Sequence, residues 1–104
     1  MKVLVPGHQY ALDNFEDPAT TPAQWLKFIQ KEKIDGSTEL VTVCNGTTTE
    51  EVLEMLIDRS KYLFNKFPSK ETAVAITKME EALLWLEKRT RDRIKRNVEG
   101  RYLS

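Results

Sequence analysis

The residues with the most evident chemistry lie in one basic stretch near the C-terminus, residues 88–96. Six of its nine residues are Lys or Arg, and Arg89 precedes Arg93 by four positions. Side chains four residues apart project from one face of a helix, so the two guanidinium groups would point the same way. A guanidinium binds a phosphate through two parallel hydrogen bonds. The stretch therefore predicts an anion site, and a structural ion pair with an acidic residue of the preceding helix or of a second copy remains the alternative.

The net charge of the whole chain gives no indication of this basic stretch. The 104 residues contain 16 Lys and Arg and 16 Asp and Glu, for a formal net charge of zero. Residues 1–87 carry 9 basic and 14 acidic side chains, a net charge of −5, whereas residues 88–104 carry 7 basic and 2 acidic ones, a net charge of +5. The positive end can attract a phosphate or a nucleic acid.

Other reactive residue types are scarce. His8 is the single His and has no Ser, Cys or acidic partner at a recognisable spacing, so we interpret it as a strand-edge residue. The lone Cys44 excludes an intramolecular disulfide and suits a small apolar filler of a strand in a reducing compartment. The sequence contains no CxxC pair, P-loop or GxGxxG, and no cluster with metal-ligand spacing. We therefore expect no catalytic residue, no metal and no cofactor, in a protein that is not an enzyme.

The first half of the chain is divided by turn-forming residues into short pieces. Four of them have the composition of strands: Lys2–Val5, His8–Leu12, Trp25–Ile29 and Glu39–Cys44. A short helix entered at Pro22 is the alternative for Trp25–Ile29. Residues 13–22 predict a loop, and Asp35-Gly36 predicts a turn. We expect a small antiparallel sheet of three to four strands, with Phe15, Trp25 and Phe28 in its core.

The second half predicts an antiparallel helical hairpin. Thr48 and Glu51 form a capping-box pattern, and Pro68 cannot continue a helix. Between them, the apolar repeat of the first helix contains Leu53, Leu56, Ser60, Leu63 and Phe67. Ser69 then caps a second helix, which is expected to run to about Asn97 with Gly100 just beyond.

The apolar seam of the second helix changes character along its length. Its first part contains Ile76, Met79, Leu83 and Leu86, at alternating spacings of three and four residues. The same register continues through Thr90, Arg93 and Asn97, so the seam becomes polar and cationic. Arg93 is then on the seam and Arg89 beside it, near the start of the first helix. An unpaired buried charge costs several kcal/mol, so this position requires an anionic partner.

These elements predict an α+β fold in a single domain, residues 1–104. A small N-terminal antiparallel sheet occupies the β-rich part, residues 1–46, and the antiparallel two-helix hairpin covers residues 47–99. A chain of this length supports one modest core. No apolar run approaches the roughly 20 residues needed to cross a bilayer, and we expect a cytosolic protein with no membrane partner.

Several runs of the sequence resemble a known phage family. The resemblance is carried by Tyr10–Glu16, Ser37–Val43, Asn45–Leu53, Arg89–Arg93 and Val98–Gly100, and it extends over nearly the whole chain. These runs resemble the first-described Thoeris anti-defence family of signal sponges, whose helical hairpin is shared with a phage anti-CBASS sponge.

The resemblance implies a binding protein without turnover. Members of the family bind glycocyclic ADP-ribose signals made by bacterial TIR proteins and sequester them uncleaved, in the cytoplasm of the infected host. Some members also hold cyclic oligonucleotides in separate pockets. Members form dimers that build hexamers, and the signal occupies a recessed pocket between protomers. The resemblance implies the same partners, assembly and location for this chain.

The resemblance also assigns ligand-binding residues. The family aromatic that stacks on the adenine matches Tyr62, and the arginines that hold the phosphates match Arg89 and Arg93. A family Asn early in the second helix falls at Thr72, which offers one hydroxyl in place of an amide. Thr72 and Arg89 are 17 residues apart on one helix, which is roughly 25 Å. One small nucleotide cannot contact both within a chain, so the assignment requires a pocket made by two protomers.

Two other functions fit the basic stretch. A nucleic-acid-binding hairpin would use residues 88–96 on a phosphate backbone and would lose affinity steeply with salt. No aromatic residue interrupts that stretch, and residues 1–87 are acidic, which makes long nucleic acid the less favoured partner. A protein-interaction hairpin would instead pair the arginines with the acidic first helix. The family resemblance therefore favours a cyclic ADP-ribose sponge over both alternatives.

Overall fold

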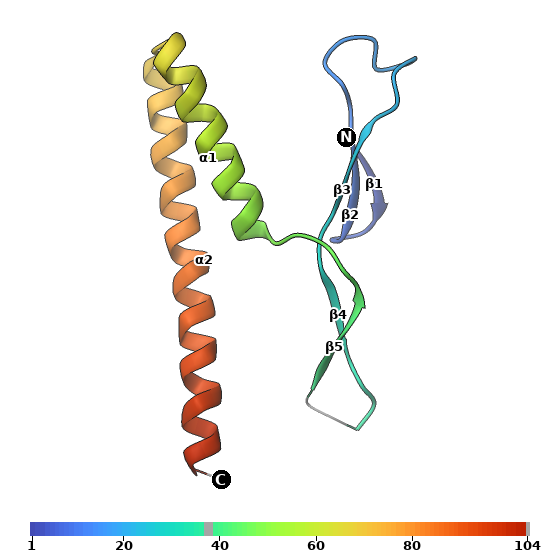
Figure 1. Ribbon diagram of the computed structural model, residues 1–104, viewed down its shortest axis with the longest axis vertical. Coiled ribbons are helices and arrows are strands. Elements are labelled where there is room, and N and C mark those ends of the chain that lie inside the picture. Colours follow the sequence, from blue (N-terminus) through green and yellow to red (C-terminus); the bar gives the residue numbers. More distant parts are fainter. Residues whose placement is uncertain (37–38, 104) are drawn as a thin grey trace. The chain divides into compact units, whose positions relative to one another are not determined.

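Five short strands and two helices follow one another along the chain (Figure 1). The computed structural model describes the backbone of residues 1–36 and 39–103 and, in those ranges, side chains as far as Arg96. The Ser37-Thr38 part of the family resemblance, and the side chains of Asn97 and Val98–Gly100, lie outside the described residues. The chain divides into two compact units, Met1–Thr49 and a second that begins at Glu50. The predicted α+β class, in which an antiparallel β-rich part is followed by a helical hairpin, is confirmed.

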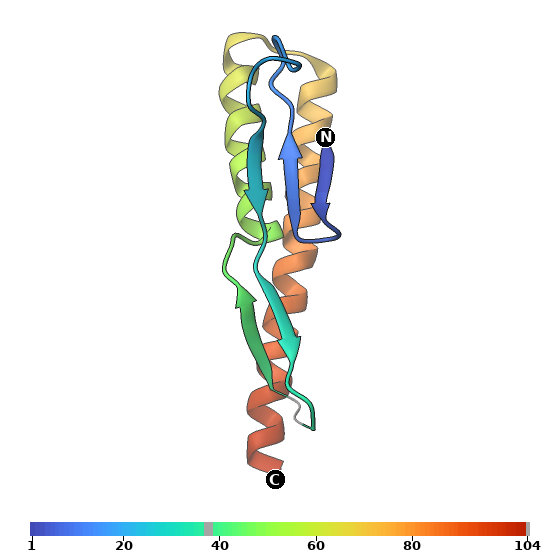
Figure 2. The ribbon, with the colours of Figure 1, turned by 90° about the vertical axis from the view of Figure 1, so that its right-hand side faces the viewer.

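Two small antiparallel sheets make up the first unit. The strands of the larger sheet pair in the order β1 (Lys2–Val5), β2 (Gln9–Leu12) and β3 (Gln24–Lys27). The smaller sheet consists of β4 (Gln30–Lys33) and β5 (Leu40–Cys44). Figure 2 shows how β3 leads into the β4–β5 hairpin. The predicted Asp35-Gly36 turn lies at the tip of this hairpin, where Gly36 has a φ of 76°, the left-handed region that glycine tolerates best.

The two sheets are joined by a close backbone contact after β3. Phe28 forms a parallel bridge with Thr47. The Ile29 N–H donates to the Thr47 carbonyl (2.8 Å), and the Thr47 N–H donates to the Lys27 carbonyl (2.9 Å). A Cβ on Gly46 would lie 2.6 Å from the carbonyl carbon of Phe28. This position therefore needs glycine, which gives a physical reason for the Asn-Gly-Thr run that follows β5.

The predicted strands are confirmed with changed boundaries. β1 matches its prediction, and β2 and β5 each begin one residue later than predicted. The piece that contains Trp25 is a strand only over Gln24–Lys27. β4 is missing from the prediction because Gln-Lys-Glu-Lys has no β-branched or aromatic residue. Its pairing with β5 makes two sheets, so the prediction of a single sheet is wrong.

The predicted aromatic core of the sheet is only partly correct. Phe28 is half-buried, and its ring meets that of Tyr10 edge-on with the centroids 5.9 Å apart. Phe15 and Trp25 are exposed, so their placement in the core is wrong. Trp25 pairs across the sheet with the buried Ala11. Three strands of four residues each offer too little surface to cover an indole.

The second unit is the predicted hairpin, built from two unequal helices. α1 spans Thr49–Lys66 and α2 spans Lys70–Leu103. α1 ends ahead of Pro68, as predicted, because proline cannot continue the helical hydrogen bonds. The Ser69 hydroxyl caps α2, as also predicted, by accepting the Thr72 N–H at 3.1 Å.

The inner faces of the hairpin carry its core. Ile57 on α1 and Ile76 on α2 are each 8% exposed. The predicted seam of α2 is confirmed, because Met79, Leu83 and Leu86 are half-buried beyond Ile76. The first part of α2 is therefore held against α1 by apolar side chains, which supply the main favourable free energy of such packing.

The predicted seam of α1 is correct at two positions and displaced by one residue at two others. Leu53 and Ser60 are half-buried, as expected. Three other predicted seam residues are exposed: Leu56, Leu63 and Phe67. Ile57 and Phe64 lie nearer the centre of the inner face. The sequence pattern could not separate these registers because α1 carries apolar residues on more than one face.

α2 extends well beyond α1. It contains 34 residues and α1 contains 18, which correspond to roughly 51 and 27 Å. α2 passes Gly100, so the predicted end near Asn97 is wrong; a single glycine costs a helix only about 1 kcal/mol. Arg89 lies beside Glu50 in the first turn of α1, and from there on α2 has no helix of its own unit beside it (Figure 1). No described helix is long and apolar enough to span a membrane.

Candidate functional site

Arg89 lies where α2 passes the start of α1, as the sequence predicts. Its Nη2 is 4.0 Å from Oε1 of Glu50, which is an ion pair at the limit of contact. The Arg89 side chain remains 61% exposed, and that of Glu50 is 27% exposed. Exposed ion pairs of this kind contribute about 0–1 kcal/mol. The structural pair and the anion site are therefore compatible, because the guanidinium keeps most of its surface open to a ligand.

Arg93 lies one turn further along α2, past the start of α1. It is exposed and has no ion pair with any side chain that the structure describes. The register does place it in line with the seam, but α1 does not reach this level. The expectation that Arg93 is buried against the first helix is therefore wrong for a single chain, and its charge is solvated instead.

The residues around Arg89 form a continuous basic face on α2. Trp85, Lys88, Arg89, Asp92 and Arg96 line a shallow hollow of about 230 Å³. Their spacings of three, one, three and four residues put all of them on one side of the helix. We call these five residues the basic face. It combines an exposed aromatic ring with three cations, which suits a ligand that carries both a flat ring and a negative charge.

Asp92 is the single acidic residue of the basic face. Lys88 donates a hydrogen bond to its Oδ2 (2.8 Å) and lowers the pKa of this carboxyl below its ordinary value. The positive charges of Lys88, Arg96 and Arg91 act in the same direction. Asp92 is therefore ionised at neutral pH and neutralises part of the charge of Lys88, so Arg89 and Arg96 are the cations of this face that form no hydrogen bond with it.

Trp85 is the residue of the basic face that the sequence did not predict. Trp85 is 71% exposed, although it is apolar and directly precedes the half-buried Leu86 of the seam. The spacing does place Trp85 on the same face of the helix as Arg89, since Trp85 precedes Arg89 by four residues. A basic stretch that is defined from residue 88 onwards does not include Trp85.

Tyr62 lies on the outer side of α1. It is five positions after the buried Ile57, about 140° further around the helix, and is 59% exposed. The Lys66 Nζ lies 4.7 Å from the centroid of its ring, in a cation–π contact worth about 0.5–1 kcal/mol at an exposed site. One face of the ring is thus covered by Lys66 and the other can receive a base.

Thr72 lies in the first turn of α2, at the closed end of the hairpin. It is half-buried, and its hydroxyl oxygen accepts a hydrogen bond from the Ser69 hydroxyl at 2.8 Å. Its N–H donates to the same Ser69 oxygen. Thr72 is therefore part of the helix cap, and its hydroxyl keeps one hydrogen to offer to a ligand.

The four predicted ligand-binding residues fall into two groups. Arg89 and Arg93 are one turn apart at the open end of the hairpin, while Thr72 is 17 residues away along an uninterrupted α2, roughly 25 Å. Tyr62 is close to the closed end, because the neighbouring Lys61 pairs with Glu80 at 3.3 Å. A single chain does not bring these two groups together.

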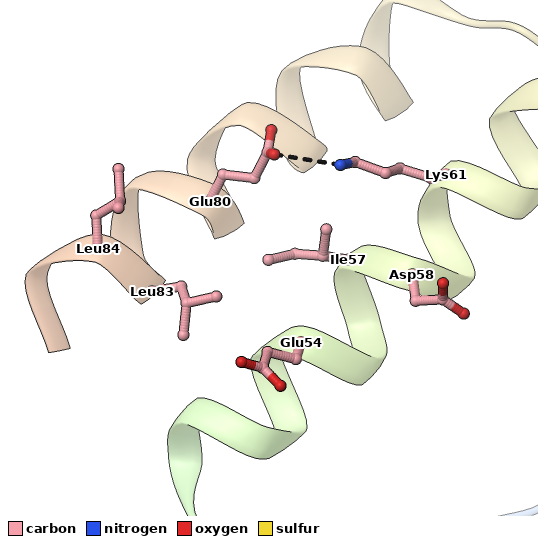
Figure 3. A pocket seen from close by; sticks show the side chains of 7 residues that line it. All are labelled: Glu54, Ile57, Asp58, Lys61, Glu80, Leu83 and Leu84. Atoms are coloured by element: carbon pink, nitrogen blue, oxygen red, sulfur yellow. Dashed lines mark ion pairs between the residues drawn. The ribbon is translucent and has the colours of Figure 1, made fainter. Parts of the chain in front are cut away.

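A second hollow lies between the two helices (Figure 3). Its volume is about 340 Å³. Three apolar residues, three acidic residues and one basic residue line it: Ile57, Leu83, Leu84, Glu54, Asp58, Glu80 and Lys61. We call it the acidic groove. Its charge is opposite to that of the basic face, and neither the hollow nor its charge was predicted.

His8 and Cys44 both make hydrogen bonds within the first unit. The backbone of His8 closes the β1–β2 turn through its N–H to Val5 and accepts the Phe28 N–H at 2.7 Å. Cys44 ends β5, half-buried, with the Gln9 amide 3.9 Å from its sulfur. Among the residues that the structure describes, no three His, Cys, Asp or Glu side chains are grouped so as to hold a metal ion.

The sequence is similar to known proteins over part of its length. Residues 31–91 match the family model described as the Acb2/Tad1 hairpin domain. The chain is also 51% identical, over 57 residues, to the protein named Thoeris anti-defense 1 of Bacillus phage SBSphiJ7. That alignment covers 54% of this chain but only 40% of the relative. The matched region of the family includes Tyr62, Thr72 and Arg89, and ends two residues before Arg93.

Proposed function

This chain belongs to the Acb2/Tad1 hairpin family, and from that premise we propose that it is a phage anti-defence protein that captures a nucleotide signal. The signal is of the cyclic ADP-ribose type, made by bacterial TIR proteins in Thoeris immunity. The protein binds it in the cytoplasm of the infected host and withholds it without cleavage. Cyclic oligonucleotide signals in a separate pocket belong to the same proposal and are supported by the family resemblance alone.

One observation carries this proposal: two arginines one helical turn apart remain open at the end of the hairpin. Arg89 is mostly exposed despite its contact with Glu50, and Arg93 is solvated beyond α1. A pyrophosphate presents several anionic oxygens within a few ångströms, which two adjacent guanidinium groups can bind together. Each charge-assisted hydrogen bond contributes about 1.5–3 kcal/mol.

The second half of the proposed pocket comes from a partner copy. Tyr62 stacks on the adenine and Thr72 donates its remaining hydroxyl hydrogen, both from a protomer other than the one that supplies the arginines. The 25 Å separation along α2 supports this arrangement, since a single chain cannot close the pocket. We therefore propose a homo-oligomer, and the family resemblance alone supports dimers that build a hexamer.

Sequestration without turnover agrees with the chemistry of the basic face. General acid catalysis needs a group that carries a transferable proton near neutral pH. Asp92, the carboxyl nearest the two arginines on α2, is held ionised by Lys88, so it cannot supply that proton. Arg89 and Arg93 can stabilise a phosphate but keep their own protons.

The deciding experiment is a capture-and-release assay. The protein is incubated with the product of a TIR enzyme, filtered and heat-denatured, and the released compounds are identified by mass spectrometry. We expect retention of the signal by the protein and release of the intact molecule. Release of a cleaved product would indicate an enzyme, and no retention would reject capture altogether. The Arg89→Ala/Arg93→Ala variant is the negative control.

A second candidate function, binding of single-stranded nucleic acid, is favoured by one observation. Trp85 adds an exposed ring to the cations of the basic face, and base–aromatic stacking beside cations is the usual basis of such binding. A salt titration separates the two functions. Affinity for a long RNA or DNA should fall steeply between 50 and 200 mM salt if phosphate-backbone contacts dominate.

A further inference from the structure

The basic face has the parts of a small binding site within a single helix. Its five residues line one hollow of about 230 Å³, which is smaller than the volume of about 300–1,000 Å³ that is usual for drug-sized ligands. The hollow is therefore suited to one compact molecule. All five residues come from α2, so one chain provides the whole hollow.

Trp85 supplies a flat apolar surface at one end of this hollow. It is 71% exposed, and no aromatic ring or cation among the described residues stacks on it. Arg89 follows one helical turn later, roughly 6 Å along the axis, and its side chain is 61% exposed. An exposed indole binds nucleobases by stacking. The spacing therefore suits a ligand whose flat ring lies a few ångströms from its negative charge.

The charge of the basic face suits a single phosphate group. Three cations and one carboxylate give the face a net charge of +2, and Glu50 opposes part of the charge of Arg89. A phosphate monoester carries a charge of about −1.5 to −2 at neutral pH. A longer run of phosphates would have to pass Asp92, whose lowered pKa keeps it ionised. The face therefore favours one nucleotide over a strand of nucleotides.

Arg96 lies at the other end of the hollow. Side chains of a helix incline toward its N-terminus, so that of Arg96 inclines toward Asp92 and Arg89. The positive charge of Arg96 reaches Asp92, because it helps to lower the pKa of that carboxyl. Lys88 already donates a hydrogen bond to Asp92. Arg89 and Arg96 are therefore the two guanidinium groups that this face offers to a phosphate.

We propose that the basic face is a nucleotide site within one chain and that it takes a nucleoside monophosphate. The base stacks on Trp85, and the phosphate lies between Arg89 and Arg96, which bind it through charge-assisted hydrogen bonds. Tyr62 and Arg93 take no part in this site. It is therefore distinct from the pocket proposed for the signal, except that both use Arg89.

The shared arginine has a consequence that rests on the proposed function. One guanidinium cannot bind two phosphates at full strength, so a nucleotide on the basic face competes with the cyclic ADP-ribose-type signal for Arg89. Saturating adenosine monophosphate should raise the apparent dissociation constant of the signal for the wild type and leave it unchanged for Arg96→Ala. Equal competition in both proteins would put the nucleotide in the signal pocket and overturn the separate site.

The fluorescence of Trp85 tests the site directly. The chain contains two Trp residues, so a Trp25→Phe variant reports on Trp85 alone. The probes are adenosine monophosphate, adenosine without the phosphate, and ribose 5-phosphate without the base. We expect saturable quenching by adenosine monophosphate and binding that is about tenfold weaker for the other two, because each lacks one of the two contacts. Equal binding of all three, or no quenching at millimolar concentration, would overturn the proposal.

Substitutions followed by isothermal titration calorimetry identify the contacts. Trp85→Leu and Arg96→Ala should each weaken binding of adenosine monophosphate about tenfold, while Trp85→Phe keeps a ring and should retain most of the affinity. Lys95→Ala is the matched control for Arg96→Ala, because it removes a neighbouring charge about 100° around the helix, and it should bind like the wild type. Circular dichroism confirms that each variant is folded. Wild-type affinity in Trp85→Leu, or equal losses in Arg96→Ala and Lys95→Ala, would overturn the site.

Failure of this site is distinguishable from failure of the proposed function. Arg93→Ala should lose the signal and still bind adenosine monophosphate. A protein that binds adenosine monophosphate but retains no product of a TIR enzyme keeps the nucleotide site and rejects capture, and the opposite result keeps capture and rejects the site. Affinity that rises steadily with the length of an oligonucleotide would assign the basic face to single strands and overturn the site for one nucleotide.

Discussion

The first and second parts of α2 form one continuous helix, but only the first part lies beside α1. From Ile76 to Leu86 the inner face lies against α1, and Ile76 is buried. From Thr90 to Arg96 the same register continues with no neighbouring helix, and the side chains are exposed. A heptad register therefore predicts the direction of a side chain, while its burial depends on whether a second helix extends to that level.

The largest expected effect comes from the covered part of the helix. Ile76→Ala removes three carbons from a buried site and should lower the free energy of unfolding by about 2–4 kcal/mol. The matched control is Ile94→Ala, in the overhanging part, where the side chain is 59% exposed. It should change stability by less than about 0.5 kcal/mol in the isolated chain. Urea denaturation followed by circular dichroism measures both, and similar losses for the two variants would contradict the comparison.

The next prediction concerns function in the overhanging part. Arg89→Ala and Arg93→Ala should each weaken binding of the cyclic ADP-ribose-type signal by at least tenfold, because each removes a charge-assisted contact worth about 1.5–3 kcal/mol. Neither should change the oligomer measured by sedimentation. Isothermal titration calorimetry gives the affinity, and Lys78→Glu, outside the basic face, serves as the control. Wild-type affinity in either arginine variant would show that the site is elsewhere.

The closed end of the hairpin gives a smaller effect. Ser69→Ala removes the hydroxyl that accepts the Thr72 N–H and donates to the Thr72 oxygen. Loss of such a cap costs about 1 kcal/mol. The substitution should lower the Tm by a few degrees and leave the signal affinity nearly unchanged, unless the cap also orients Thr72 toward the ligand. A large loss of affinity with a small loss of Tm would assign that orienting role to Ser69.

The sequence predicted those features that depend on neighbouring residues in the chain. The Ser69 cap, the stop at Pro68 and the Ile76 seam all follow from local pattern and are confirmed. β4 was missed because it is held by pairing with β5, not by its own composition. The α1 register was wrong by one residue because Leu56 and Ile57 are both apolar and only packing distinguishes them.

The sequence predicted part of the candidate site, as it did for the fold. The sequence identified the basic stretch and the 25 Å separation that requires two chains, since both follow from helix geometry. It did not identify Trp85, the acidic groove or the solvated state of Arg93. Each of these depends on where α1 begins and ends beside α2, which is a property of the hairpin and not of either helix.

The smallest expected effect comes from Asp92, the acidic residue of the overhanging basic face. Lys88 lowers the pKa of the Asp92 carboxyl. The contribution of the Lys88–Asp92 pair to the stability of the fold is therefore fully present above the ordinary pKa of Asp, and it is lost only as the pH falls through the lowered pKa. At neutral pH Asp92→Asn therefore frees Lys88 and removes one negative charge close to the proposed phosphate site. Affinity for the signal should rise about two- to fivefold, the range of an exposed ion pair, and the gain should shrink in 0.5 M salt. Asp58→Asn, on α1, is the matched control, and a loss of affinity in Asp92→Asn would mean that the Lys88–Asp92 pair positions Arg89 rather than competing with the ligand.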